Sequence, residues 1–292
     1  MKKYNEYPGF LEVVKLASCG STNDYLRENY RRYERDFPIL VTASRQSAGR
    51  GRAGRTWDSP AGMGLYSSFG FFLPVGVSLN LLPLAAGISV VEALAGISGV
   101  RGFGLKWPND ILYSGRKICG ILVDNMVQKE RIFCITGIGI NLNQQAVDFP
   151  RELRDRAISL KTITGKTYEI EAVNKALSHI FFSWVEKLKS GGNKEIVEAA
   201  GRLSEFLKGR PIAFHRGDKI TEGVFKGLNH DGGLLLAAPN GDKKIYYSGE
   251  IVTKLRLLRR EELERKHRQG YTEKPVEKGE FSDFEDEQLW GD

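Results

Sequence analysis

Cysteine is scarce in this chain, and its few copies are poorly spaced for metal binding or cross-linking. The 292 residues include only Cys19, Cys119 and Cys134, and no two of them form a CxxC pair. An odd number without paired spacing argues against a disulfide framework and against a structural zinc site. The expected location is therefore a reducing compartment, and the protein is predicted to be cytoplasmic.

Long uninterrupted apolar segments are also missing. The most apolar stretch, residues 79–97, contains Asn80, Pro83, Ser89 and Glu92. It falls short of the roughly 18 clean apolar residues that a membrane span needs. The opening sequence MKKYNEYP has two lysines but no apolar segment of the kind found in secretory signals. We therefore expect no association with a membrane.

Charge is unevenly distributed along the chain. Lys and Arg number 43 against 36 Asp and Glu, giving a net charge of +7. Residues 259–292 alone carry −4, which leaves +11 on the first 258 residues. A basic body favours anionic partners such as nucleic acid, nucleotide phosphates or an acidic protein surface, although a plain solvated surface has the same composition. The apolar content of 41% excludes disorder of the whole chain.

Hydrophobic patterning predicts an α+β fold in the first two thirds of the chain. Short apolar or aromatic runs predict strands at residues 10–16, 39–43, 65–73, 111–113, 118–123 and 132–136. Helices are predicted from a cap at Thr22 or Asn23 through Tyr30, and over residues 79–97, 171–188 and 195–207.

Beyond Gly209 the pattern changes to closely spaced strands. Short strands are predicted at residues 211–215, 222–228, 234–238 and 243–248, with Asp-Gly and Asn-Gly turns among the connections. This spacing indicates a small β-barrel. We therefore expect a main domain at residues 1–207, a small barrel domain at 208–258 and a partly disordered charged tail at 259–292.

A glycine- and arginine-rich segment, GRGRAGRTW at residues 49–57, is the first candidate for chemistry. Its glycines satisfy GxGxxG, but no helix start follows, and residues 69–82 contain no acidic residue. Dinucleotide binding through this motif is thus excluded. The remaining interpretations are a flexible loop whose Arg50, Arg52 and Arg55 close over an anionic ligand, or a basic patch on the surface.

Two further motifs each have a functional and a structural interpretation. KWPND at residues 106–110, followed by Lys117, provides lysines for phosphate and a carboxylate, Asp110, for Mg²⁺, but it also suits a turn between strands. GIGINLN at residues 137–143 leaves one face of a strand without side chains. That face admits either a ligand, which Asn141 can fix, or another backbone.

Taken together, these motifs resemble those of the biotin protein ligases, the biotin–[acetyl-CoA-carboxylase] ligases. Ser21-Thr22-Asn23, Gln46 with GRGRAGRTW, KWPND, Lys117 with GIL after it, and GIGINLN follow in that order over residues 18–143. The resemblance implies a mixed β-sheet with flanking helices, similar to class II synthetases, and an SH3-like barrel at the C-terminus. With about 20 residues before Ser21, we expect no winged-helix DNA-binding domain and no repressor role.

The resemblance also implies a two-step reaction. The biotin carboxylate attacks the α-phosphate of ATP, supplied with Mg²⁺, and forms biotinyl-5′-AMP and pyrophosphate. A lysine of a biotin carboxyl carrier domain then attacks the mixed anhydride. Biotin binding is thereby implied for Ser21, Thr22, Asn23, Gln46, Arg50, Gly51, Arg52 and Lys117. Nucleotide binding is implied for Arg52, Arg55, Trp57, Lys106, Asn109, Asp110, Lys117 and Asn141.

Within those sets the resemblance gives Lys117 and Arg52 the catalytic roles, and Asp110 any contact with the metal. The alternatives are a lipoate ligase or octanoyltransferase, which resemble biotin ligases in fold, and a basic RNA-binding module. An octanoyltransferase uses a cysteine nucleophile, whereas Cys119 is expected to be a packed core residue. All four histidines lie outside the motifs, so no histidine base is expected. The enzyme is expected to be a monomer or a homodimer.

Overall fold

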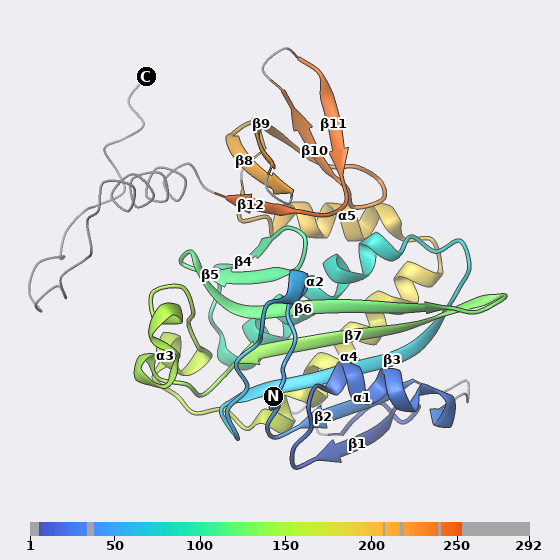
Figure 1. The fold of residues 1–292 in the computed structure, drawn as a ribbon, viewed down its shortest axis with the longest axis vertical. Helices are drawn as coiled ribbons and strands as arrows, with labels where there is room; N and C mark the ends of the chain where they lie inside the picture. The colour runs from blue at the N-terminus through green and yellow to red at the C-terminus, as the bar shows by residue number, and fades with distance from the viewer. Residues whose placement is uncertain (1–5, 34–37, 207, 217–218, 239–240, 253–292) are drawn as a thin grey trace, which may run out of the picture. The chain divides into compact units, whose positions relative to one another are not determined.

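A seven-stranded mixed sheet organises the first 206 residues (Figure 1). The computed structural model describes residues 6–33, 38–206, 208–216, 219–238 and 241–252. In spatial order the strands are β1 (Glu12–Leu16), β2 (Ile39–Ala43), β3 (Gly64–Pro74), β7 (Arg131–Asn141), β6 (Arg116–Val127), β5 (Asp110–Tyr113) and β4 (Phe103–Lys106). Strands β1 and β2 run parallel, and the other neighbours are antiparallel.

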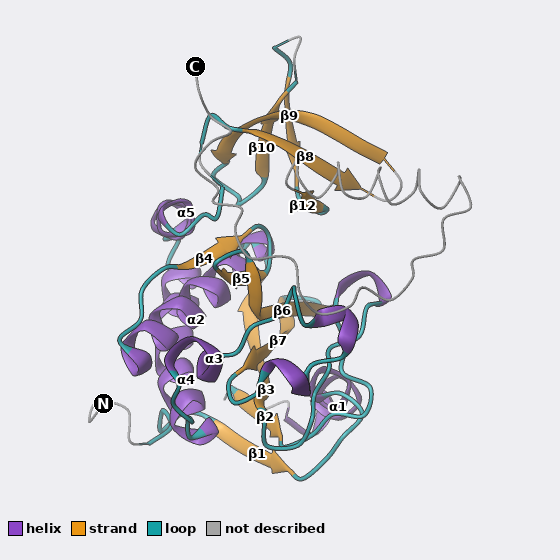
Figure 2. Cartoon of the chain, turned by 90° about the vertical axis from the view of Figure 1, so that its left-hand side faces the viewer, coloured by secondary structure: helices purple, strands orange, loops and turns teal. Residues whose placement is uncertain are grey.

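Helices cover both faces of this sheet, but unequally (Figure 2). On one face lie α2 (Leu82–Ser98) and α4 (Ile170–Lys189), with α5 (Asn193–Arg202) packed against both. On the other lies α1 (Thr22–Asn29). Alternation along β7 follows this division, since Cys134 and Ile138 join the large core with α2 and α4, whereas Phe133 and Ile135 pack with Leu26 of α1.

Helix α2, with the short 3₁₀ turn before it, is the most apolar helix of the described residues. By length and composition Leu79–Ser98 meets the requirement for a membrane span, contrary to the expectation from its polar interruptions. However, 67% of its most apolar window is buried inside the fold, as in the core helix of a globular protein. Its apolar character is therefore explained by packing on the sheet.

A second, five-stranded sheet follows α5. It consists of β8 (Pro211–Arg216), β9 (Lys219–Leu228), β10 (Leu234–Ala237), β11 (Lys243–Tyr246) and β12 (Glu250–Val252), in the order β11-β10-β9-β8-β12. Phe214, Leu236 and Ile251 are among its buried apolar residues. This antiparallel sheet agrees with the expected SH3-like fold. Residues 6–251 of the described chain, with both sheets, belong to one unit.

The predicted strands are confirmed, but their ends differ. The strand predicted at residues 132–136 extends to Asn141, whereas the one predicted at 10–16 begins at Glu12 and the one predicted at 243–248 ends at Tyr246. Strands β4 and β12 and the short helix α3 (Leu160–Thr164) were not anticipated. Strands of three or four residues and a single helical turn give weak periodic signals. Helix α5 ends at Arg202, well before residue 207. The charged tail at 259–292 lies outside the described residues.

The predicted cap of helix α1 is wrong. Ser21 is at the N-cap position, without a side-chain capping bond, and Thr22 and Asn23 lie inside the first turn. Both of these side chains are buried and bind residues of other segments instead.

Candidate functional site

Three glycines on β6 and β7 make room for the site on the α1 face of the sheet. A Cβ atom at Gly139 would lie 2.5 Å from Trp57 Nε1, and one at Gly120 would lie 3.0 Å from the same indole. A Cβ atom at Gly137 would collide with the Asn23 amide. The glycines of residues 137–143 were expected to admit a ligand or another backbone. In the structure they make room for the side chains of Trp57 and Asn23.

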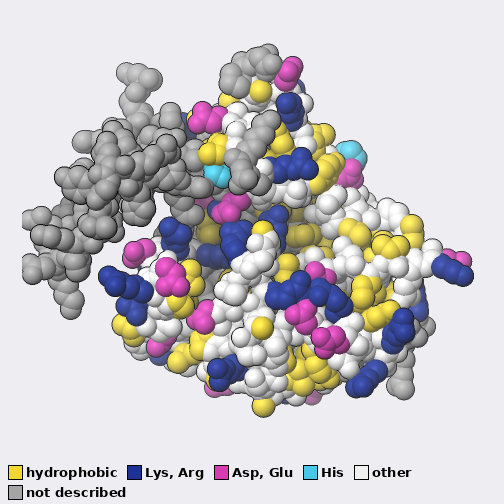
Figure 3. Space-filling model, in the orientation of Figure 1, with side chains coloured by type: hydrophobic (Ala, Val, Ile, Leu, Met, Phe, Trp, Pro, Cys, Tyr) yellow, Lys and Arg dark blue, Asp and Glu magenta, His cyan; other side chains and the backbone are white. Residues whose placement is uncertain are grey.

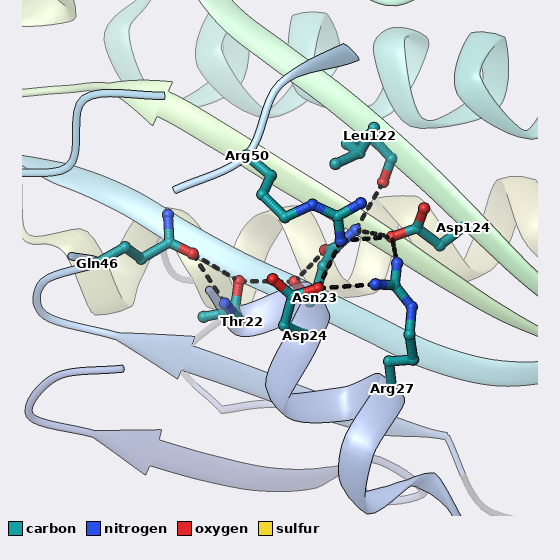
Figure 4. Close-up of polar contacts among 9 residues, drawn as sticks. Thr22, Asn23, Asp24, Arg27, Gln46, Arg50, Leu122 and Asp124 are labelled. Atoms are coloured by element: carbon teal, nitrogen blue, oxygen red, sulfur yellow. Dashed lines mark hydrogen bonds and ion pairs between the residues drawn. The ribbon is translucent and has the colours of Figure 1, made fainter. Parts of the chain in front are cut away.

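A buried set of uncharged polar groups lies at one end of this glycine surface (Figure 4). Gln46 Oε1 accepts from the backbone N–H of Thr22 at 2.9 Å and from its hydroxyl at 3.2 Å. The Ser68 hydroxyl on β3 donates to Asn23 Oδ1 at 2.6 Å and lies 2.7 Å from Thr22 Oγ1. Ser21 is buried next to them, at 4% exposure. Such fixed neutral donors and acceptors suit a polar ligand group without charge.

Ser68 was not identified from the sequence. It lies in an aromatic strand, and only its full burial between two polar side chains singles it out.

Lys117 lies at the other end of the site, with its backbone held on both sides. Its N–H donates to Arg156 O at 2.7 Å, and its carbonyl accepts from the Ile158 N–H at 3.0 Å. Its Nζ is 2.7 Å from Asp110 Oδ1 and 5.4 Å from the ring centre of Trp57. At 35% exposure the ammonium group remains accessible to an anion from solvent.

Asn141 supports this arrangement from within. Its amide nitrogen donates to the carbonyls of Ile158 at 3.2 Å and of Lys117 at 3.4 Å, and its oxygen accepts from Gln144 at 3.3 Å. The side chain is 5% exposed. Both ends of the amide are bonded to the protein, and the bond to the Lys117 carbonyl helps to hold the main chain of that residue. Contact of Asn141 with a nucleotide stays a prediction.

The tip of the glycine and arginine loop is a tight turn. Gly51 N–H donates to Arg55 O at 2.7 Å, and Ala53 and Gly54 adopt left-handed backbone conformations with φ of 53° and 73°. Such conformations are easy for glycine and costly for alanine, so the turn is a strained one.

The arginines of this loop are held in different ways. Arg52 Nη1 donates to Asn109 Oδ1 at 2.8 Å, and Asn109 in turn donates to Ile121 O at 2.8 Å. Burial lowers the pKa of the Arg52 guanidinium, while Asp110 acts in the opposite direction. Arg50 lies apart from Arg52, paired with Asp24 and Asp124.

Glu250 of the C-terminal sheet binds two further cations of the site. Its carboxylate oxygens lie 3.1 Å from Arg55 Nη1 and 3.3 Å from Lys106 Nζ. Burial would raise the pKa of Glu250, but Lys106 and Arg55 outweigh this effect and hold the pKa below its ordinary value. The neighbouring Gly249 carbonyl accepts from Arg52 at 3.4 Å. Glu250 was missed because nothing in a short barrel strand marks one glutamate as part of a distant site.

The structural interpretation of the KWPND motif is confirmed, and the same turn also contributes side chains to the candidate site. Residues 107–109 form the predicted turn between β4 and β5, and Trp107 is buried, with its indole donating to Gly232 O at 2.9 Å. The same turn places Asn109 against Arg52 and Asp110 against Lys117.

Among the described residues no cluster of three or more Cys, His, Asp or Glu side chains is arranged to hold a metal. Asp110 is the acidic side chain nearest Lys117, and its charge is balanced by that lysine. Cys119 is fully buried, and burial raises its thiol pKa, so the expectation of a packed, unreactive residue is confirmed. Acid–base or thiolate chemistry from these groups is therefore not indicated.

The arrangement thus joins a neutral polar end to a cationic end. Lys and Arg side chains gather in the middle of one face, with acidic side chains next to them (Figure 3). Fixed cations that remain partly exposed can stabilise negative charge on a phosphate or on a carboxylate under attack.

Comparisons with known proteins agree with this arrangement. Residues 16–142 match the biotin/lipoate A/B protein ligase family, and residues 208–253 match the biotin protein ligase C terminal domain. A biotin–[acetyl-CoA-carboxylase] ligase of Paracoccus denitrificans is 31% identical over 217 residues, which cover 70% of this chain and 86% of that protein. The bifunctional ligase/repressor BirA of Bacillus spizizenii is 34% identical over 215 residues, 71% of this chain.

The chain spans about 64% of the length of that Bacillus relative. Among solved structures, the biotin protein ligase of Aquifex aeolicus in complex with biotin and ATP has a TM-score of 0.68 at 33% identity. The match covers 82% of this chain and 97% of that one. By sequence and by fold, this chain belongs to the family of the biotin protein ligases.

Proposed function

We propose that the chain activates biotin with ATP as biotinyl-5′-AMP and transfers the biotin to a lysine of a biotin carboxyl carrier domain. The carrier is expected to belong to a carboxylase of the acetyl-CoA carboxylase type. The observation that carries the proposal is the combination, in one site, of a buried set of neutral polar side chains with an accessible Lys117 ammonium and the cations of the glycine and arginine loop. The Aquifex relative, crystallised with biotin and ATP, supports it.

Biotin has a neutral ureido ring and an anionic carboxylate, and the two ends of the site suit these groups. The ring would bind among Ser21, Thr22, Asn23 and Gln46, where donors and acceptors are already oriented. Its carboxylate would then extend toward Lys117 under the cover of Arg52 and Gly51. Orientation of this kind lowers the entropic barrier to reaction with a second bound substrate.

Activation follows from charge placement. A carboxylate oxygen of biotin attacks the α-phosphorus of ATP, and the bond to pyrophosphate breaks. Lys117, which then bridges the carboxylate and the α-phosphate, balances the charge that accumulates there, with Asp110 as its resting partner. Arg52, Arg55 and Lys106 would bind the phosphates, and Trp57 would stack on the adenine. Mg²⁺ would arrive with ATP as part of that substrate, with Asp110 as its nearest protein carboxylate.

In the second step the amine of the carrier lysine attacks the acyl carbon, the bond to the phosphate oxygen breaks, and AMP leaves. Residues 1–207 would form the catalytic domain and residues 208–258 the SH3-like domain, with 259–292 as a charged tail. We expect a cytoplasmic monomer or homodimer that binds neither DNA nor membrane.

Transfer of biotin to a purified carrier domain, measured by intact mass, tests the proposal. Parallel reactions omit ATP or replace biotin with lipoate. Addition of one biotin that requires ATP is the expected result. Transfer of lipoate without biotin would instead identify a lipoate ligase. If neither is transferred, binding of RNA under a salt titration becomes the next measurement, since such binding weakens steeply with salt.

A further inference from the structure

Four charged side chains form a closed network at the neutral end of the site (Figure 4). Asp24 Oδ1 lies 2.5 Å from Arg50 Nη1 and 2.8 Å from Arg27 Nη1. Asp124 Oδ2 lies 2.5 Å from Arg27 Nη2 and 3.5 Å from Arg50 Nη1. Each arginine therefore contacts both carboxylates, and the network has no net charge.

The network joins three segments that are far apart in sequence. Asp24 and Arg27 lie on helix α1, and Asp124 lies on β6. Arg50 lies at the start of the glycine and arginine loop. All four side chains are 21–38% exposed, so the contacts are only partly screened by solvent. The start of the loop is thus attached to helix α1, which also provides Thr22 and Asn23.

Asp124 also fixes the orientation of Asn23. The Asn23 amide nitrogen donates to Asp124 Oδ2 at 3.1 Å and to Leu122 O at 3.3 Å, which uses both of its hydrogens. Its oxygen faces the Ser68 hydroxyl at 2.6 Å. An amide turned end for end would place its oxygen against a carboxylate and a carbonyl, which is repulsive.

Arg50 differs in this respect from the other cations of the site. Its charge is shared by two carboxylates, whereas Lys117 has one and Arg52 is bonded to an amide and a carbonyl. An anionic substrate would have to compete with both carboxylates for Arg50. Its side chain is therefore suited to holding the loop and not to binding the anion.

We propose that Asp24 and Asp124 are positioning residues that anchor Arg50, and that this anchor holds the loop closed over the biotin end of the site. The proposal rests on the proposed function, and it changes the role of Arg50 from a ligand of the anion to an attachment of the loop. The far side of the loop is attached separately, through Arg55 to Glu250. Release of the Arg50 anchor alone should open the loop at the biotin end.

Kinetics provide the distinguishing signature. Asp24→Asn, Asp124→Asn and Arg50→Gln should each raise the KM for biotin and the escape of biotinyl-AMP by about three- to tenfold, the range expected for partly exposed charge pairs in one network. The KM for ATP should stay within about twofold, because the cations at the nucleotide end are untouched. Escape is measured as labelling of a bystander protein relative to the carrier domain.

The closing experiment combines these variants in a double-mutant cycle. The double variant Asp24→Asn with Arg50→Gln should have the same KM for biotin and the same escape of biotinyl-AMP as Arg50→Gln alone. The reason is that Asp24 is proposed to act on the loop through its contact with Arg50. Glu171→Gln is the control. Like the aspartate variants, it removes one negative charge and an ion pair, here with Lys15, but Glu171 lies on α4, on the other face of the sheet. Asp124→Glu should recover part of the loss. If Asp124→Asn fails to fold, the Asp24 and Arg50 variants still complete the cycle.

Three results would overturn the anchor. Folded variants with unchanged biotin KM and unchanged escape would show that the network does not hold the loop. A fully additive cycle would show that Asp24 and Arg50 act independently. A larger rise in the KM for ATP than for biotin would make Arg50 an anion ligand. Failure of the wild-type chain to transfer biotin would refute the proposed function, and wild-type transfer with unaltered variants would refute only the anchor.

Discussion

Replacement of Lys117 by alanine should separate the fold from the chemistry more clearly than any other single change. The main chain at this position is held by Arg156 and Ile158, and by the Asn141 amide, and all of these bonds survive truncation of the side chain. The side-chain contacts that are lost are the ion pair with Asp110, in which Lys117 is 35% exposed, and the contact of the ammonium with the Trp57 ring. Pairs of this exposure contribute about 1 kcal/mol or less to stability.

The effect on adenylation should be far larger. If Lys117 balances the charge that builds up between the carboxylate and the α-phosphate, its loss resembles the removal of one preorganised donor from an oxyanion site. Such removals reduce the rate by roughly 100- to 1,000-fold. The free energy of unfolding should meanwhile fall by about 1 kcal/mol, which lowers the midpoint of thermal unfolding by about 2–4 °C for a domain of this size.

Pyrophosphate release that depends on biotin reports on adenylation without the carrier, and a thermal melt of the same sample reports on the fold. Lys15→Ala is a matched control, because Lys15 also forms a 2.7 Å ion pair, with Glu171, but lies on the exposed strand β1. An adenylation rate for Lys117→Ala within a few fold of that of the control would refute the role given to Lys117. A large loss of stability would instead show that the side chain is structural.

Three further outcomes are expected. Arg52→Gly should loosen the loop and let biotinyl-AMP escape, so stray labelling of lysines in a protein mixture should rise; unchanged labelling would contradict this. Glu250 has a lowered pKa in the folded chain, so the stability that it contributes is present at neutral pH and is lost as the pH falls below about 4. Acid titration of unfolding should show a smaller loss in Glu250→Gln than in wild type. Gly139→Ala would place a methyl group 2.5 Å from Trp57 and should raise the KM for ATP, whereas Gly96→Ala, in open space on α2, should leave it unchanged.

The sequence predicted the main elements of the fold because their signals are local. Strand β2 (Ile39–Ala43) is a continuous apolar run, and α4 has the 3/4 spacing of an amphipathic helix, so periodicity alone identifies both. The cap of α1 was predicted wrongly for the same reason. A Thr or Asn at a helix start suggests a cap, but the tertiary partners Gln46 and Ser68 determine where these side chains point.

The candidate site was predictable only where residues are grouped in motifs. Lys117 and Asp110 stand close together in sequence, and the structure pairs them. Glu250 is 144 residues from Lys106 along the chain, and Asp124 is 97 from Arg27, so no pattern of spacing indicates either contact. Long-range ion pairs of this kind depend on sheet order and register, which local propensity does not encode.

The balance of charge differs between the two ends of the site, and this difference would let a single loop serve both proposed substrates. At the end proposed for biotin, two arginines pair with two aspartates. The network therefore has no net charge, which suits a polar but uncharged ring. At the other end four cations, Lys106, Arg52, Arg55 and Lys117, lie near three carboxylates of the described residues, Asp110, Glu250 and Glu205. The excess of positive charge would attract a triphosphate, and it would remain to hold the adenylate after pyrophosphate has left. Because Arg50 belongs to the neutral end and Arg52 and Arg55 to the cationic end, closure of the loop would bring the two proposed substrates together.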